Sequence, residues 1–293
     1  MKLLRVGDPG RERPALLDQG GVLRDLSSVV RDIDAAAVSP AGIEKIAAAD
    51  LTRLPPIEQS VRIGPCVARP GKFLCIGLNF ADHAAETNAP IPEEPVLFFK
   101  ATTAICGPMD NVQQPRGSTK LDWEVELAFV IGATCRYVPE SEAAGAIAGY
   151  FICHDVSERN FQLERGGTWD KGKGCDTFGP IGPWLVTADE IADPLDLRMW
   201  LEVNGRRFQN GSTRTMIFKP AFLVSYISQF MTLEPGDIVT TGTPPGVGLG
   251  QRPPVYLKPG DTVRLGIDGL GEQCQRIVAA RCAPISANSQ FSQ

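Results

Sequence analysis

Several features are scarce or absent in this 293-residue chain, and each absence excludes a class of protein. None of the eight cysteines forms a Cys-x-x-Cys pair, which argues against a zinc site and a disulfide framework. No apolar run nears the roughly 20 residues that a membrane helix needs. Long runs of one charge are missing and the net charge is −5, which argues against binding to nucleic acid or to a membrane surface. We therefore expect a soluble, cytoplasmic protein with reduced cysteines that acts on small molecules.

The rest of the composition, 43% hydrophobic and 22% charged, is that of an ordinary globular protein. Short apolar runs between turns predict a small β-rich N-terminal domain over residues 1–65. Residues 70–283 alternate β-rich segments with Gly and Pro turns and contain few clear helices. This pattern predicts an α+β fold, a mixed β-roll, in place of a doubly wound sheet. The polar tail, residues 284–293, is predicted to be disordered.

Two helices have clear sequence signals. Ser39 is a good N-cap and Pro40 suits the first helical position, so a helix is predicted from there to Asp50. Residues 220–233 space their apolar side chains as a helix does. Four prolines between residues 51 and 71 predict a linker without regular structure.

Acidic and large apolar residues alternate between Leu121 and Phe129. Asp122, Glu124 and Glu126 should share one face of a strand, because side chains two residues apart point the same way. Carboxylates that close repel one another and are costly to bury unpaired, so a cation is expected among them. A hard divalent metal is the simplest candidate. The alternative is a half-buried strand with a solvated acidic face.

A further acidic residue, Asp155, follows the apolar run of residues 147–153, where a strand gives way to polar residues. It is a candidate third ligand, with a turn or capping role as the alternative. Two glutamates and one aspartate supply only oxygen donors. This set favours Mg²⁺, with Mn²⁺ or Ca²⁺ as alternatives, over zinc.

One of the two histidines, His83, lies three residues before Glu86. In a helix the two side chains would meet, and the carboxylate could orient the imidazole and stabilise its charged form, as a general base requires. The alternative is an inert surface pair. Prolines and acids follow in residues 87–95, which favours a lid that closes over substrate.

Two glycine-rich segments are further candidates. Lys171 and Lys173 lie in an irregular stretch, and one of them is predicted to project into a site, with a solvated loop lysine as the alternative. Residues 240–250 combine hydroxyls with closely spaced glycines, which suits a loop whose backbone amides approach an anion. A structural double turn is the alternative. The loop lacks the Gly-Lys-Ser/Thr of a nucleotide P-loop, so nucleotide binding is not expected.

Taken in order, a set of segments resembles the signature segments of the fumarylacetoacetate hydrolase family: GLNFADHAAE, PVLFFK, DWEVELAFVIG, HDVSERNFQ, KGCDTFGPIGPW, LEVNG and TGTPPGVG. The resemblance spans residues 72–277, and within the family the chain is most similar to bacterial proteins labelled 2,4-diketo-3-deoxy-L-fuconate hydrolase or ureidoglycolate lyase. It implies a mixed β-roll catalytic domain, a small keto acid substrate, Mg²⁺ and a homodimer.

The resemblance also implies roles for individual residues. The implied metal ligands are Glu124, Glu126 and Asp155. The implied catalytic residues are the water-activating dyad, His83 and Glu86, and the lysine beside the metal, Lys173. The implied substrate-contacting or site-lining residues are Lys100, Arg159, Gln162 and Thr243.

The chain departs from the usual family pattern at a few positions. His154 replaces Asn, Phe80 replaces Tyr, Asn160 replaces Asp, and Gly174 and Cys175 replace Ser-Phe. None of these changes removes a ligand or the dyad. His154 adjoins a ligand and is therefore placed to alter its surroundings.

The implied reaction is hydrolysis of a carbon-carbon bond in a 2,4-diketo acid, giving pyruvate and a second acid. An oxaloacetate decarboxylase and a 2-hydroxyhepta-2,4-diene-1,7-dioate isomerase are alternatives, because the same enolate serves both reactions and neither needs an attacking water. A ureidoglycolate lyase is another, because its substrate also presents a carboxylate beside an oxygen. The dyad favours hydrolysis. A non-catalytic metabolite-binding protein is the remaining alternative, but it should have lost a ligand or the base.

Overall fold

The structure, a computed structural model of the chain, describes residues 1–82 and 91–280. Three predictions fall outside these ranges: the His83/Glu86 pair with its helix and lid, the state of Cys282, and the disordered tail at 284–293. The seven cysteines within the ranges are all free thiols, as predicted for them. No helix in the described ranges is long and apolar enough to cross a membrane.

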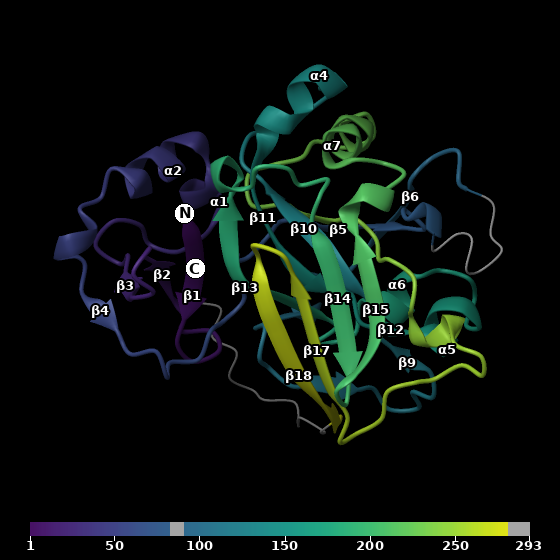
Figure 1. The fold of residues 1–293 in the computed structure, drawn as a ribbon. Coiled ribbons are helices and arrows are strands. Elements are labelled where there is room, and N and C mark those ends of the chain that lie inside the picture. Colours follow the sequence, from purple (N-terminus) through teal and green to yellow (C-terminus); the bar gives the residue numbers. More distant parts are fainter. Residues whose placement is uncertain (83–90, 281–293) are drawn as a thin grey trace, which may run out of the picture.

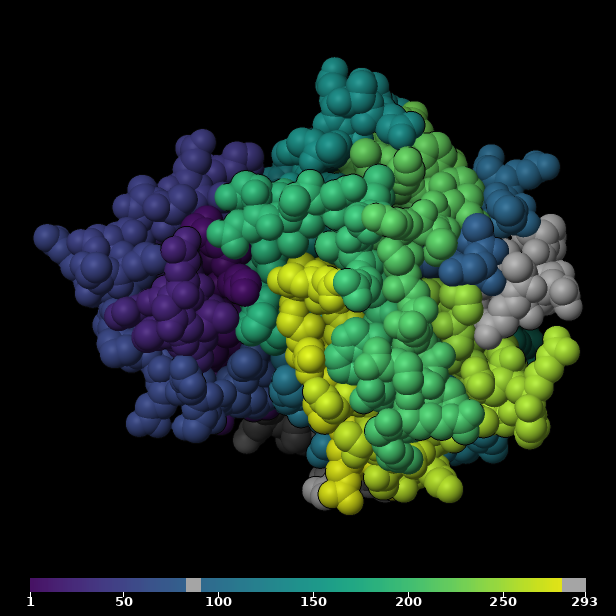
Figure 2. Space-filling view, viewed as in Figure 1, coloured from purple at the N-terminus to yellow at the C-terminus, as the bar shows by residue number. Residues whose placement is uncertain are grey.

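The N-terminal strands form an antiparallel meander that extends the main sheet of the molecule. Strand β1 pairs with β2 on one side and with β13 on the other, where Leu3 lies opposite Leu185. Figure 1 shows this meander at one end of the sheet, and Figure 2 shows the same residues, in purple and blue, lying against the rest of the protein. The strands involved are β1 (Lys2–Val6), β2 (Arg13–Leu17), β3 (Leu23–Asp25), β4 (Pro56–Ile57) and β13 (Gly179–Thr187).

The main sheet has eleven strands within the described residues, in the order β4-β3-β2-β1-β13-β11-β10-β16-β5-β6, with β7 beside β13. Most neighbours are antiparallel, but β16 pairs with β5 in parallel, as β7 does with β13. The fold is therefore mixed and α+β, as predicted. The remaining strands of this sheet are β5 (Phe73–Gly77), β6 (Val96–Phe99), β7 (Ile105–Cys106), β10 (Val125–Ile131), β11 (Ile147–His154) and β16 (Ile238–Thr240).

A second sheet packs across the first and completes the roll. Its order is β15-β14-β17-β18-β8, and a separate pair joins β9 to β12. The largest hydrophobic cluster lies between the two sheets and includes Leu127 and Ile152 from the first and Leu201 and Leu265 from the second. These strands are β8 (Val112–Gln114), β9 (Leu121–Asp122), β12 (Ser157–Glu158), β14 (Arg198–Val203), β15 (Arg206–Ser212), β17 (Thr262–Ile267) and β18 (Gly271–Ala279).

Short helices cover the edges of the sheets (Figure 1). The helix predicted after Ser39 is present, and the Ser39 hydroxyl caps it by accepting the Gly42 N–H at 3.1 Å. The predicted linker was wrong in part, because it contains β4 and a helical turn at Leu51–Arg53. The helices are α1 (Ala35–Val38), α2 (Pro40–Ala47), α4 (Glu140–Ala143), α5 (Arg159–Leu163), α6 (Asp170–Lys173) and α7 (Pro220–Ser228).

The helix predicted over 220–233 ends earlier, at Ser228. Leu233 lies beyond its end and pairs with Cys135 through two backbone hydrogen bonds of 2.9 Å. The end of the predicted helix therefore forms an isolated β-bridge with the segment around Cys135. The helical spacing of the apolar residues did not reveal this bridge.

We predict that Leu3→Ala lowers the free energy of unfolding of the whole protein by about 2–5 kcal/mol, because Leu3 is fully buried where the meander joins the sheet. All four tryptophans lie after residue 120; Trp184 packs against the meander, but the summed fluorescence during urea unfolding reports mainly on the rest of the chain. Leu163→Ala, at a side chain that is 49% exposed, is the matched control. An unchanged tryptophan transition in Leu3→Ala would show that the meander unfolds independently.

Candidate active site

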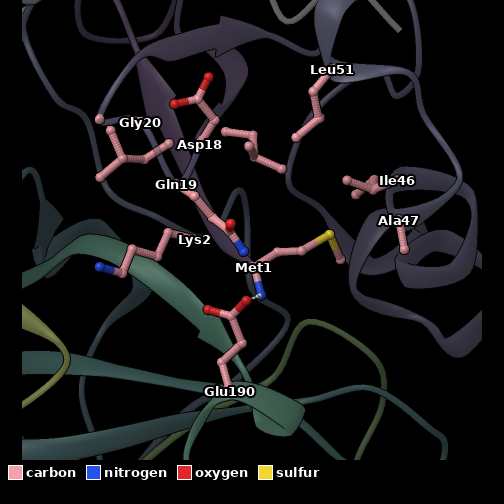
Figure 3. Close-up of a pocket in the computed structure, with 12 residues that line it drawn as sticks. Met1, Lys2, Asp18, Gln19, Gly20, Ile46, Ala47, Leu51 and Glu190 are labelled. Atoms are coloured by element: carbon pink, nitrogen blue, oxygen red, sulfur yellow. Dashed lines mark ion pairs between the residues drawn. The ribbon is translucent and has the colours of Figure 1, made fainter.

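The described residues line several cavities, and size does not identify the active site. A cavity of about 670 Å³ lies between the meander, α2 and the turn at Glu190 (Figure 3). Its acids are already engaged: Glu190 pairs with the Met1 amino group at 2.9 Å, and Asp18 pairs with Arg24 at 2.9 Å. This cavity gathers no cluster of unpaired reactive groups.

A smaller cavity, of about 260 Å³, contains the acidic residues that the sequence singled out. Carboxylate oxygens of Glu124, Glu126 and Asp155 all lie within 4.8 Å of one another, and the three residues are buried. Glu126 belongs to β10, Glu124 directly precedes β10, and Asp155 directly follows β11. Pairing of β10 with β11 brings them together, with the Asp155 N–H donating to the Glu124 carbonyl at 3.0 Å.

Asp122 does not join the other acids, so the prediction of three carboxylates on one face of one strand was wrong. Regular pairing breaks at Trp123 and Glu124, which puts Asp122 in β9. Its Oδ1 accepts the N–H groups of Trp123 at 2.8 Å and Gly248 at 2.6 Å. The alternative of a solvated acidic face was also wrong, because every residue from Leu121 to Ile131 is buried.

Three cationic side chains surround the carboxylates. The Lys173 Nζ lies 2.8 Å from Glu124 Oε2 and 2.7 Å from Asp155 Oδ2. Arg159 donates from Nε to Asp122 Oδ2 at 2.8 Å and from an Nη to Glu124 Oε1 at 2.6 Å. Lys100 pairs with the other oxygen of Asp155. All three cations are buried, so these contacts are charge-assisted hydrogen bonds with little solvent screening.

The pKa values show where negative charge remains. Burial would raise the pKa of Glu124, but Lys173 and Arg159 outweigh it and hold that pKa well below its usual range. Burial raises the pKa of Glu126 well above its usual value, and the charges of Asp155 and Glu124 raise it further. Burial would lower the pKa of Lys173, but Asp155 and Glu124 keep it raised. Lys173 is therefore a permanent cation and not a base, and Glu126 is the carboxylate whose ionised form is least compensated.

The residues present fit a divalent cation. Three buried cations accompany four buried carboxylates, which leaves Glu126 without a cationic partner among the described residues. Oxygen ligands lie about 2.0–2.6 Å from Mg²⁺ or Ca²⁺, so two ligands of one ion are separated by at most about twice that distance. The carboxylate oxygens lie within 4.8 Å of one another, which meets this limit for Ca²⁺; around Mg²⁺, whose limit is about 4.2 Å, the side chains would close by a few tenths of an ångström. Glu124, Glu126 and Asp155 could hold the ion.

The glycine-rich loop at 240–250 does approach anions, but they are carboxylates of the protein itself. Gly242, which has a φ of +89°, donates its N–H to Glu126 Oε2 at 3.0 Å. The N–H groups of Gly248 and Leu249 bind Asp122. Thr243 lines the cavity, but its hydroxyl donates to the Val125 carbonyl at 2.9 Å and so has no hydrogen left for a ligand.

Gln162 presents hydrogen-bond donors to the cavity. Its Oε1 accepts from Arg159 at 3.0 Å, and because a guanidinium can only donate, this contact fixes the orientation of the amide. The Nε2 group has no acceptor among the described residues, and Gln162 lines the cavity. Arg159, by contrast, already binds Asp122, Glu124 and Gln162. Arg159 thus orients Gln162, which remains available to a ligand.

The three predicted lysines differ in how close they lie to the cavity. Lys173 is buried at the end of the one-turn helix α6, whereas Lys171 is exposed and bonds to the Arg165 carbonyl. Lys100 is buried behind Asp155 and also donates to the Val156 carbonyl at 3.1 Å, so it supports a ligand without lining the cavity. His83 and Glu86 lie outside the described residues.

His154 points away from the carboxylates, into the space between the two sheets. Its Nδ1 lies 3.0 Å from Gln275 Oε1, and its Nε2 is buried without a hydrogen-bond partner in the described ranges. Burial lowers the pKa of His154 to about 4, so the ring is neutral at pH 7. It connects the strand that carries Asp155 to the second sheet.

Sequence reasoning missed two residues of the site, Gln209 and Trp169. Gln209 binds the Val125 N–H at 2.9 Å and the Thr243 hydroxyl at 2.8 Å, thereby joining the two segments that hold Glu126. Trp169 lines the cavity and contacts Phe98, with ring centroids 5.2 Å apart. A tryptophan in a glycine-rich, polar segment is a signal that could have indicated Trp169. Gln209 gives no signal in the sequence, because its partners are distant in the chain.

Two glutamates and one aspartate, held beside a buried lysine in a mixed β-roll, define an enzyme class with an acidic, metal-binding centre. The chain belongs to the fumarylacetoacetate hydrolase family: residues 72–278 match the family model described as Fumarylacetoacetate (FAA) hydrolase C-terminal. The enzymes of this family include hydrolases and isomerases. A Burkholderia multivorans protein provisionally named a hydrolase is 59% identical over 96% of this chain and its own full length.

Solved structures agree with this assignment. A fumarylacetoacetate hydrolase from Exiguobacterium antarcticum is 35% identical, with a TM-score of 0.86. A 5-carboxymethyl-2-hydroxymuconate delta-isomerase from Mycobacterium smegmatis is 34% identical, with a TM-score of 0.76. A maleylpyruvate hydrolase from Sphingobium sp. SYK-6, solved with manganese(II) and pyruvate, is 29% identical, with a TM-score of 0.80. Each covers 96% of this chain and 100% of its own.

We predict that Mg²⁺ or Mn²⁺ raises the melting temperature of protein previously stripped with a chelator. At 100 times the dissociation constant the ion contributes about 2.7 kcal/mol, or roughly 5 °C for a chain of this size. Glu126→Gln should abolish the rise. It should also raise the melting temperature of the metal-free protein at pH 7, because it removes a buried carboxyl whose ionisation the folded state opposes and the unfolded state allows.

The control for this experiment is Glu140→Gln, at an exposed acid, which should respond to the metal as the wild type does. Differential scanning calorimetry measures all of these temperatures. A metal-dependent rise that persists in Glu126→Gln would exclude Glu126 as a ligand.

Proposed function

We propose that the protein hydrolyses a carbon-carbon bond of a 2,4-diketo acid, giving pyruvate and a second acid, in a reaction that depends on Mg²⁺ or Mn²⁺. The observation that carries the proposal is the buried triad Glu124, Glu126 and Asp155, with the free amide donors of Gln162 and the charged Lys173 beside it. A cavity of about 260 Å³ suits a small metabolite, since drug-sized ligands occupy about 300–1,000 Å³.

When bound, a divalent cation would polarise the 2-keto oxygen and offset the charge of the substrate carboxylate. Gln162 would donate its free N–H groups to that carboxylate and so fix the direction in which the substrate extends. Lys173, charged at any physiological pH, would stabilise negative charge that develops on the oxygens next to it. Arg159 would keep Gln162 in position.

His83 and Glu86 are proposed as the water-activating pair, as the family resemblance implies. His83 would take a proton from water, whose oxygen then bonds to the C4 carbonyl carbon. The C3–C4 bond breaks, the electron pair leaves with C3 as the enolate of pyruvate, and protonation at C3 gives pyruvate. The second product is the carboxylic acid formed from C4. One water is consumed, and the remaining atoms are those of the substrate.

The family also includes isomerases, and the polar floor of the cavity would serve them equally well. Isomerisation, decarboxylation of oxaloacetate and lysis of ureidoglycolate require no water at C4, so the role of His83 distinguishes hydrolysis from these reactions. The free thiols of the described cysteines support a reducing, cytoplasmic location. The exposed Tyr137 and Phe230 side chains support association into the proposed homodimer.

We predict that the Mn²⁺-loaded wild type releases pyruvate from acylpyruvates, and that His83→Ala slows this release by about 10²–10⁴-fold, the usual contribution of a general base. The metal-dependent rise in melting temperature should remain in the variant, which serves as its folding control. Pyruvate is measured with a coupled dehydrogenase. Unchanged release in His83→Ala would remove His83 from the mechanism, while CO₂ from oxaloacetate with all diketo acids untouched would refute hydrolysis.

Gln162→Leu should raise KM by about 10–100-fold, because a hydrogen bond to a charged group contributes about 1.5–3 kcal/mol. The melting-temperature rise with Mn²⁺ should stay at the wild-type value, since Gln162 is not a ligand. Steady-state kinetics on one acylpyruvate measure the effect. A KM within twofold of wild type would show that the amide does not bind substrate.

A further inference from the structure

The walls of the cavity differ in polarity from its floor. The floor consists of the buried triad with Lys173 and Gln162. The apolar side chains that line the rest of the cavity are Ile76, Leu78, Phe98, Leu163, Trp169, Val247 and Leu249. Exposure places two of these at the mouth, because Leu163 is 49% exposed and Leu249 is 38% exposed. A substrate bound to the floor by its carboxylate and keto group would therefore extend its far end along apolar side chains.

The lining residues in the described ranges offer no free cation for a second carboxylate. Arg159 binds Asp122, Glu124 and Gln162, and Lys173 binds Glu124 and Asp155. Both cations are buried at the floor, and none of the lining residues at the mouth is charged. A dicarboxylic substrate would leave its second charge beside Trp169 and the two leucines without a cationic partner among the described residues, which is unfavourable.

Hydroxyl groups at the far end of the substrate would also find few hydrogen-bond partners among the described lining residues. The one hydroxyl among the described lining residues, that of Thr243, donates to the Val125 carbonyl and accepts from Gln209. Two side-chain donors of the lining have no acceptor among the described residues: the Gln162 Nε2, which the carboxylate at the floor needs, and the Trp169 indole N–H, which can serve one hydroxyl. A sugar-acid chain would therefore exchange water for apolar walls at most of its hydroxyls.

We propose that the substrate is a 2,4-diketo acid with an apolar acyl group, alkyl or aromatic, that carries neither a second carboxylate nor hydroxyls. This inference rests on the proposed hydrolysis and narrows its substrate class. Trp169 is the principal specificity residue, since its ring is the largest apolar surface that lines the cavity. The ring is seated over Gly77, where an added Cβ would come within 2.5 Å of Trp169 Cζ3.

The first test compares kcat/KM of the Mn²⁺-loaded wild type on three diketo acids with the same head group: benzoylpyruvate, maleylpyruvate and a 2,4-diketo-3-deoxy sugar acid. We expect benzoylpyruvate to be preferred over each of the others by about 10²-fold, the discrimination that an apolar pocket exerts against polar groups. Equal or faster turnover of maleylpyruvate or of the sugar acid would overturn the inference and leave the proposed hydrolysis intact. No pyruvate from any of the three would refute the hydrolysis itself.

The second test changes the walls. Gly77→Ala should displace the Trp169 ring and lower kcat/KM for benzoylpyruvate about tenfold, with an unchanged melting-temperature rise on Mn²⁺ as the folding control. Gly145→Ala is the matched control, because a Cβ there meets nothing within 4 Å. Wild-type kcat/KM for benzoylpyruvate in a folded Gly77→Ala protein would show that Trp169 does not shape the pocket.

A gain of function completes the test. Leu163→Arg places a cation at the mouth and should raise kcat/KM for maleylpyruvate at least tenfold over the neutral variant Leu163→Gln. The same pair should differ little on benzoylpyruvate. No gain for Leu163→Arg would show that the far end of the substrate does not lie at this wall.

Discussion

The site depends on one electrostatic constraint: three carboxylates are held out of water within 4.8 Å of one another, and a fourth buried carboxylate, Asp122, is linked to them through Arg159. Charges buried in this way are tolerated only when cations and hydrogen-bond donors surround them. Lys100, Lys173 and Arg159 supply the cations, and backbone N–H groups of the loop at residues 242–249 supply further donors. Among the described residues the arrangement still lacks one positive charge, which a divalent ion could supply.

This constraint explains the positions of side chains that never touch a ligand. Asp122 looks like a metal ligand in the sequence, but it fixes Arg159, which in turn fixes Glu124 and Gln162. Lys100 restrains Asp155 from behind. Removal of one member would therefore change the orientation of the others, because Lys100, Lys173 and Arg159 each bind a carboxylate and at least one further partner. The centre is a connected network of charges and not a set of separate ligands.

Parts of this architecture that arise from neighbouring residues were predictable from the sequence. The Ser39 cap acts within three residues, and Asp155 follows its strand directly, so local rules sufficed. The break after Asp122 was not predictable, because alternation of polarity continues unchanged through it. The pairing of β1 with β13 joins segments about 180 residues apart and leaves no local signal. The partnership of Gln209 with Thr243 was hidden for the same reason.

The contact between the two short helices α5 and α6 has a consequence for how such a site can diversify. A Cβ at Gly172 would lie 2.5 Å from the backbone N of Gln162 and 2.6 Å from the Glu158 carbonyl, so only glycine allows the helices to touch. This contact locks Gln162 and Lys173 together, independently of the exposed segment 164–168 that joins the helices. Insertions or exchanges in that segment can therefore reshape the entrance while the charged floor stays in register. The entrance of the cavity can thus vary in evolution or by design, whereas the charged floor cannot.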